Sequence, residues 1–237
     1  MFRLTGEVHK LPTFIGASYC VNSDDAPVLI DCAIPIERRG VIFGIKKIGF
    51  SPKDIRAVML THDHPDHSGN AGYFEEIGVN IYCHEEEAES LKGCCATPSF
   101  EFSPPRPVAR TIMKTALALL MQRPPIVAHK LFKAPESFLG FEVIHLPGHT
   151  KGSVAYLHKS SGTLFCGDAL LCALPPWTIR QKLALPEKAF CYDYTQALNS
   201  LKKLYAIDFD NLCAGHGKPI IGDADKKVRK FLESAIR

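Results

Sequence analysis

The sequence predicts an α/β fold, which we expect to form a single domain over residues 1–237. In the first third of the chain, short β-forming runs alternate with stretches of helical periodicity. Three strand-like runs then follow one another between residues 141 and 166, as in a β meander. The length of 237 residues, with 46% hydrophobic side chains, is sufficient to bury a substantial core.

The elements expected in the first third follow from local signals. Strand-like runs bounded by turn residues occur at 14–21, 27–30, 55–60 and 80–83. Helical patterns occur at 36–48, 69–77 and 85–91. Gly49 ends the first of these helices, and Ser68 precedes the second as its expected N-cap. The strand at 55–60 leads directly into a cluster of histidines, which is therefore expected in a loop at a strand end.

Residues 93–135 interrupt this alternation. Proline clusters at 103–107 and 123–125 flank a helix-like stretch at 108–121. We predict an inserted segment over 93–135 that is either a lid over a functional site or a peripheral packing element. A second irregular stretch, at 170–190, contains the only tryptophan of the chain.

The remainder of the chain returns to regular patterns. Strand-like runs are expected at 141–146, 153–158, 162–166 and 211–214. Asp193 is the expected N-cap of a helix at 193–205. The terminal helix, at 223–236, has one apolar face, which consists of Val228, Phe231, Leu232 and Ala235.

Seven side chains have the chemistry of metal ligands. They are His62, His64, Asp66, His67, His149, Asp168 and His216. Imidazole and carboxylate are the ligands that borderline divalent ions such as zinc prefer. The first four fall within six residues, a density that ten histidines in 237 residues rarely produce by chance. Seven ligands are enough for two adjacent metals, an arrangement typical of hydrolytic sites.

The spacing within the cluster is consistent with this interpretation. In extended backbone, His62 and His64 point to the same side of the chain. Asp66 and His67 are adjacent and require a bend, which Pro65 helps to set through its fixed φ angle. One short loop can therefore offer two histidines to one metal and an Asp–His pair to another.

The composition restricts the classes of function. A net charge of +3 and a pI of about 8.3 are too mild to indicate a nucleic-acid partner. The N-terminal residues lack the apolar core of a secretory signal, and the apolar run at 116–121 is too short to span a bilayer. Nine cysteines without a Cys-x-x-Cys pair argue against a disulfide framework, and Cys166 and Cys213 are expected to be buried. We therefore expect a cytoplasmic protein with a small-molecule substrate and no membrane partner; its oligomeric state is not predicted.

Five motifs together resemble the metallo-β-lactamase-fold hydrolases over nearly the whole chain. They are LIDC (29–32), THDHPDHSG (61–69), LPGHTKGSV (146–154), FCGD (165–168) and AGHG (214–217). The resemblance implies a four-layer αββα sandwich, with two sheets back to back, helices outside and metals held by loops at strand ends. The Gly-His-Gly ending is most similar to the glyoxalase II-like and lactonase-like branch.

The resemblance also implies roles for the candidate ligands. The family pattern assigns to a first metal His62, His64 and His149. It assigns to a second metal Asp66, His67 and His216, with Asp168 as the bridge. Two divalent ions are therefore expected, with zinc favoured and iron or manganese as alternatives. Asp31 resembles the family's supporting carboxylate that orients the histidine loop, and Thr150 is a candidate either to support His149 or to cap a turn.

The activity implied by the resemblance is metal-dependent hydrolysis. A hydroxide bridging the two metals would attack a small ester, thioester or lactone carbonyl. Asp66 would act as the catalytic residue, by orienting the hydroxide or by passing a proton to the leaving group. No substrate-binding residue is assigned; candidates for the pocket wall are Phe100, Met113, Leu117, Trp177 and Arg180.

Other enzymes resemble the same ligand order. Persulfide dioxygenases of this fold use one iron, whose ligands here would be His62, His149 and Asp168. RNA-processing nucleases and other phosphodiesterases of the fold form a second alternative, although the chain lacks the basic arm with which those nucleases bind RNA. The remaining histidines are not expected to bind metal: we expect His84 and His145 to be structural and the others to lie at the surface, namely His9, His129 and His158.

Overall fold

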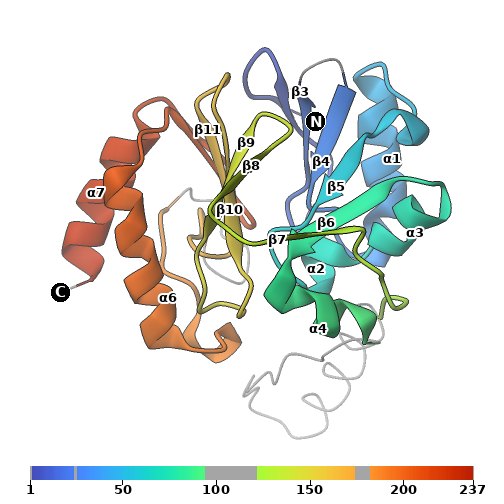
Figure 1. Ribbon diagram of the computed structural model, residues 1–237. Helices are drawn as coiled ribbons and strands as arrows, with labels where there is room; N and C mark the ends of the chain where they lie inside the picture. Colours follow the sequence, from blue (N-terminus) through green and yellow to red (C-terminus); the bar gives the residue numbers. More distant parts are fainter. Residues whose placement is uncertain (1, 24–25, 94–121, 174–181, 237) are drawn as a thin grey trace, which may run out of the picture.

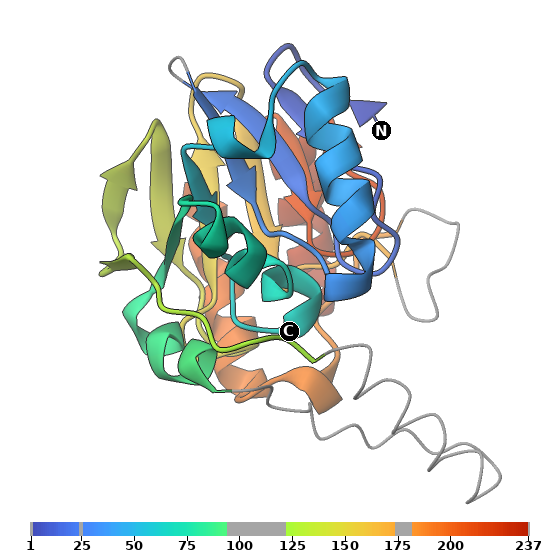
Figure 2. The same ribbon diagram turned by 90° about the vertical axis from the view of Figure 1, so that its right-hand side faces the viewer.

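Two β-sheets pack back to back, with helices on both outer faces (Figures 1 and 2). The structure is a computed structural model that describes residues 2–23, 26–93, 122–173 and 182–236. The seven-stranded sheet runs in chain order: β1 (Phe2–Arg3), β2 (Val8–Lys10), β3 (Tyr19–Ser23), β4 (Ala26–Ile30), β5 (Ala57–Met59), β6 (Asn80–His84) and β7 (Lys130–Phe132). The six-stranded sheet has the order β13 (Ile220–Ile221), β12 (Asn211–Ala214), β11 (Thr163–Gly167), β10 (Val154–His158), β9 (Phe141–His145) and β8 (Glu136–Phe138).

Each sheet is covered by its own set of helical segments. Those in the connections between strands of the first sheet are η1 (Pro35–Glu37), α1 (Arg38–Lys47), η2 (Pro52–Asp54), α2 (Pro65–Ser68), α3 (Ala71–Glu76), η3 (Glu85–Glu87) and α4 (Ala88–Lys92). Those that follow strands of the second sheet are η4 (Lys188–Phe190), α6 (Tyr194–Leu201), η5 (Lys202–Ala206) and α7 (Ala224–Ala235). Val41 and Ile45 bury the inner face of α1 in one core cluster, and Val228 and Leu232 do the same for α7 in another.

The alternation of side chains along the strands produces the four layers. In β4, Leu29 packs in the cluster under α1, whereas Val28 and Ile30 face the other sheet. In β11, Phe165 lies in that same inter-sheet cluster, while Leu164 packs under the helices of the second sheet. Both faces of these strands are therefore buried, and the predicted αββα sandwich is confirmed.

Parallel pairing brings several strand ends to one edge of the sandwich. Strands β4, β5 and β6 pair in parallel in the first sheet, and β11 pairs in parallel with β12 in the second. The loops that follow β4, β5, β11 and β12 therefore contain the residues that can meet between the sheets at this edge.

The structure corrects three local predictions. The strand expected at 14–21 begins only at Tyr19, because Phe14 and Ile15 donate their backbone N–H groups to Glu37 instead of to a neighbouring strand. Ser68 is not an N-cap, since helix α2 already begins at Pro65 and α3 follows at Ala71. The short strands β1, β2, β7, β8 and β13 have no counterpart among the predicted elements.

The predicted insertion at 93–135 divides into two parts. Residues 94–121 lie outside the described residues, so the lid interpretation stays a prediction for them. The rest belongs to the sandwich: Ile126 is fully buried, and β7 pairs in parallel with β6. Among the described residues, no helix is both long enough and apolar enough to cross a membrane.

Candidate metal centre

All seven predicted ligands meet at the edge of the sandwich where these strands end. Four of them follow β5, and they are His62, His64, Asp66 and His67. Three follow strands of the second sheet: His149 lies in the turn after β9, Asp168 directly after β11, and His216 two residues after β12. Both sheets therefore contribute to one site.

The start of helix α2 determines how the first motif presents its side chains. Residues 61–63 bend after β5, and Pro65 occupies the first position of α2 with His64 as the N-cap residue. Asp66 and His67 consequently lie in the first turn of this helix. The hydroxyl of Ser68 donates to the carbonyls of Asp63 (2.7 Å) and His64 (3.1 Å), so it holds the bend closed.

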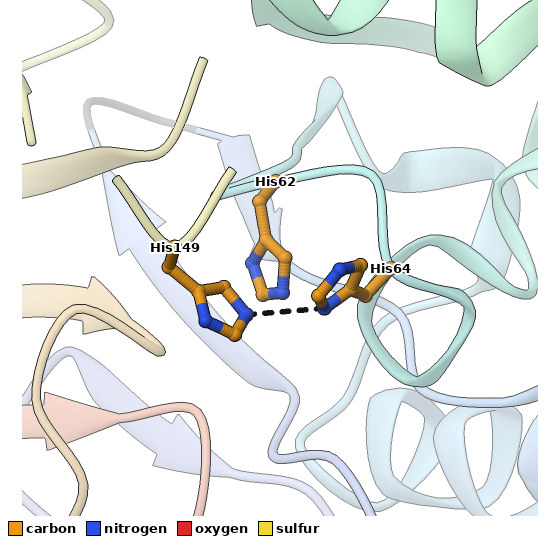
Figure 3. Close-up of side chains that lie close together, drawn as sticks. All are labelled: His62, His64 and His149. Atoms are coloured by element: carbon orange, nitrogen blue, oxygen red, sulfur yellow. Dashed lines mark hydrogen bonds between the residues drawn. The ribbon is translucent and has the colours of Figure 1, made fainter. Parts of the chain in front are cut away.

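The first group of ligands comprises His62, His64 and His149, whose rings converge (Figure 3). Nε2 of His149 lies 3.0 Å from Nδ1 of His64, and the ring centroid of His62 is 4.7 Å and 4.8 Å from those of the other two. Two nitrogens bound to one tetrahedral zinc at 2.0–2.1 Å are about 3.3 Å apart. The spacing in this group is therefore close to that of atoms that share an ion.

The second group combines two histidines, His67 and His216, with the carboxylates of Asp66 and Asp168. Nε2 of His216 lies 3.3 Å from Oδ2 of Asp66 and 3.2 Å from Oδ2 of Asp168. Nε2 of His67 lies 3.6 Å from Oδ2 of Asp66 and 3.5 Å from Oδ1 of Asp168. Asp168 also approaches the first group, since its Oδ2 is 3.7 Å from Nε2 of His149. This carboxylate thus lies between the two groups, where the resemblance places the bridging ligand.

Unpartnered atoms at the centre of this cluster fit bound cations. Nε2 of His62, Nε2 of His67 and Oδ1 of Asp168 are buried and have no hydrogen-bond partner. A buried polar atom without a partner costs about 1–3 kcal/mol, so three such atoms converging on one space indicate a site for a cation. His64, Asp66 and His216 are only partly buried, so part of the cluster is exposed to solvent.

The two groups differ in their electrostatics. Burial, together with the neighbouring His64, lowers the pKa of His149 to about 3, and burial likewise lowers the pKa of His62 well below its ordinary value. Burial also acts to lower the pKa of His67, but the carboxylates of Asp66, Asp168 and Asp31 outweigh it and raise that pKa to about 9. The first group thus offers neutral nitrogens, whereas the carboxylates of the second attract positive charge.

A second set of contacts fixes the orientation of the histidines. Nδ1 of His67 donates to Oδ2 of Asp31 at 2.8 Å, and Nδ1 of His216 donates to the carbonyl of Ile15 at 2.8 Å. The hydroxyl of Thr61 donates to Asp31 (2.8 Å), which leaves its oxygen as acceptor for Nδ1 of His62 (3.0 Å). In all three rings Nδ1 is occupied, so Nε2 is free to face the centre. The predicted supporting role of Asp31 agrees with this geometry.

Thr150 does not contact the imidazole of His149 through its hydroxyl. That hydroxyl lies 2.7 Å from both Oε1 of Glu87 and Oγ of Ser153, so Thr150 stabilises the turn after His149. Sequence reasoning did not identify Glu87, although it is 2% exposed and borders the site. Nor did it identify Cys191, whose Sγ lies 4.0 Å from Nδ1 of His149. Neither residue belongs to a motif, so only the fold brings them here.

The remaining histidines lie away from the cluster. His84 and His145 stack with ring centroids 4.0 Å apart, in agreement with their expected structural role. The prediction that His158 lies at the surface is wrong: it is 2% exposed, because its ring packs against Phe141 and its Nδ1 lies 2.8 Å from Oγ of Ser161. The pocket-wall candidates lie outside the described residues; they are Phe100, Met113, Leu117, Trp177 and Arg180.

Comparison with known proteins identifies the family. The family model of the metallo-beta-lactamase superfamily matches residues 11–216, so the chain belongs to this superfamily. A probable metallo-hydrolase of Bacillus subtilis (strain 168) is 29% identical over 240 residues, which cover 93% of this chain and 88% of that protein. The hydroxyacylglutathione hydrolase GloC of Haemophilus influenzae is 28% identical over 193 residues, which cover 80% of this chain and 82% of that protein. A metallo-beta-lactamase family protein from Thermus thermophilus shares the fold, with a TM-score of 0.69 and 23% identity over 98% of this chain and 80% of that one.

Proposed function

We propose that the chain is a binuclear metal-dependent hydrolase that cleaves a small ester, thioester or lactone, with zinc as the expected metal. The observation that carries this proposal is the convergence of buried nitrogen and oxygen atoms from both sheets that lack hydrogen-bond partners. Similarity to a hydroxyacylglutathione hydrolase, an enzyme named for an acylated thiol, favours an acyl bond as the target.

Some residues of the site would bind the metal ions, and one would also take part in proton transfer. Bound divalent ions would lower the pKa of a coordinated water to near neutrality and polarise the substrate carbonyl. His62, His64 and His149 would hold one ion. Asp66, His67 and His216 would hold the other, with Asp168 between them. Asp66 is partly exposed, so its carboxylate can also orient the water or deliver a proton to the leaving group.

The experiment that tests the proposal combines metal content with hydrolysis. The protein, purified without added metal, is assayed by elemental mass spectrometry and then with panels of esters, thioesters and lactones. We expect about two zinc ions per chain and turnover of at least one panel. Asp66→Ala and His64→Ala should abolish turnover while the far-UV circular dichroism is unchanged, and Asp208→Ala, which alters a surface carboxylate, should retain it.

Two results would refute the proposal. Full activity in either site variant would remove these residues from the mechanism. One iron per chain, with oxygen consumed in the presence of a persulfide and no hydrolysis, would favour the dioxygenase alternative instead.

A further inference from the structure

A buried carboxyl group joins the two loops that contain the first ligand group. Glu87 ends η3, which directly follows β6, and it is buried. Oε2 of Glu87 accepts a hydrogen bond from the backbone N–H of Asp63 (2.8 Å). Oε1 accepts from the hydroxyl of Thr150 (2.7 Å) and from the backbone N–H of Gly152 (2.5 Å).

These three hydrogen bonds connect segments of different sheets. Asp63 lies between His62 and His64 in the loop after β5, and Thr150 directly follows His149 in the turn after β9. The carboxyl group of Glu87 therefore links the two loops. The two loops that Glu87 joins contain His64 and His149, whose Nδ1 and Nε2 atoms lie 3.0 Å apart.

The turn after β9 is shaped to admit this side chain. A Cβ atom at position 152 would lie 2.7 Å from both Cγ and Oε1 of Glu87, so glycine is required for the close approach. An adjacent contact joins the same two sheets, because His84 at the end of β6 stacks on His145 at the end of β9. A buried carboxyl group is costly to desolvate, and the three hydrogen bonds with the two loops offset this cost.

We propose that Glu87 is a positioning residue for the first metal: it holds the loop of His62 and His64 at ligand distance from His149. The inference rests on the proposed metal site, but it adds a residue that touches neither ion nor substrate. Its effect passes through the backbone of Asp63 and through the turn at Thr150 and Gly152.

Glu87→Gln tests this role with a minimal change of shape. The glutamine oxygen can accept hydrogen bonds from one loop only, and its NH₂ group then faces the backbone N–H of the other. A protonated glutamic acid would not create this conflict, since its hydroxyl oxygen still accepts. The matched control is Glu86→Gln, which makes the same substitution at the neighbouring exposed position of η3.

The readout is the zinc affinity of the full-length protein, measured by competition with a chromophoric chelator. We expect Glu87→Gln to weaken one of the two zinc equivalents by about 10–100-fold, the range for partners that orient metal ligands. Glu86→Gln should bind both equivalents like wild type. Thr150→Val removes one of the three hydrogen bonds and should weaken the same equivalent to a smaller extent, which keeps the test decisive if Glu87→Gln fails to fold.

The outcomes separate this inference from the proposed function. If wild-type protein binds no zinc, the metal site itself is refuted. If wild-type protein binds two zinc ions and both Glu87→Gln and Thr150→Val bind them with unchanged affinity, the positioning role is refuted while the metal site stands. If Glu87→Gln does not fold, unchanged affinity in Thr150→Val alone refutes the role.

Discussion

Replacing Asp31 by asparagine should weaken metal binding at His67 and His62 while leaving the backbone in place. Asp31 has a left-handed backbone conformation, with φ at 54°, which asparagine tolerates better than alanine does. The substitution also preserves the size of the side chain. Its effect can therefore be assigned to the hydrogen bonds of the carboxylate.

The magnitude follows from the contacts that the carboxylate makes. Oδ1 accepts from the backbone N–H of Thr61 at 2.8 Å, and Oδ2 accepts from the hydroxyl of Thr61 and from Nδ1 of His67, each at 2.8 Å. An asparagine amide supplies only one acceptor oxygen, so in either orientation its NH₂ group faces a buried N–H donor. Leaving one buried donor unpaired costs about 1–3 kcal/mol. If this cost falls on the zinc-bound state, it corresponds to a loss of about 5–150-fold in zinc affinity, at 1.4 kcal/mol per tenfold change; if it falls on both states, it lowers the stability of the metal-free protein instead.

The assay is zinc competition with a chelator, combined with thermal unfolding of the metal-free protein. The control is Asp208→Asn, because Asp208 is an exposed carboxylate paired with Arg229 at the surface, where an ion pair contributes little. We expect the control to match wild type in both measurements. Wild-type zinc affinity and wild-type thermal stability in Asp31→Asn would refute the assigned role of this carboxylate.

Three further predictions concern protons and close packing. In the folded protein the pKa of His67 is about 9, above its ordinary value of 6.5. Protonated His67 therefore stabilises the metal-free fold fully below pH 6.5, and this stabilisation is lost as pH rises through about 9. The free energy of unfolding in urea should fall over this pH range for the metal-free protein but not for the zinc-bound protein. An identical fall in both samples would contradict the prediction. Zinc binding at pH 7 should release at least one proton per chain, because His67 must lose its proton to bind the metal. Titration calorimetry in two buffers of different ionisation enthalpy measures this release, and a binding enthalpy that is the same in both buffers would refute the prediction. In Gly215→Ala the new Cβ atom would collide with Oδ1 of Asp168 and Cε1 of His67. We expect this variant to lose bound zinc and to be about 1–3 kcal/mol less stable than wild type. The control Gly6→Ala, at an open position, should change neither property.

The sequence predicted the regular parts of the fold because their hydrophobic patterns are long enough to read. The meander of β9, β10 and β11 and the helices α1, α6 and α7 agree with their expected positions, and Asp193 caps α6 by accepting from the N–H of Gln196. Strands such as β7 and β8 have three residues each, too few to show a period. The sheet, and not local propensity, makes those residues extended.

The centre of the site was more predictable than its surroundings. Ligand chemistry is concentrated in short motifs, so His62 and its neighbours could be placed together from the sequence alone. Contacts around them depend on tertiary packing: the carbonyl of Ile15 reaches His216 from 201 residues away, and Glu87 reaches Thr150 from 63 residues away. A backbone carbonyl has no sequence signature, and a single glutamate among Glu85, Glu86 and Glu87 resembles a solvated helix start.

The division of the ligands between the sheets links the proposed chemistry to the stability of the sandwich. Each candidate group combines residues of the first sheet with at least one of the second: His149, Asp168 or His216. The two sheets are also joined at this edge by hydrogen bonds, such as those from the N–H of Val154 to the carbonyl of Thr61 (2.9 Å) and from the hydroxyl of Tyr156 to the carbonyl of Leu60 (2.6 Å). An ion bound by any of these groups would therefore also crosslink the two sheets at this edge. The buried carboxyl groups of Asp31 and Glu87 hydrogen-bond to the loops that contain these candidate ligands, so the proposed geometry of the site also depends on residues outside the ligand set.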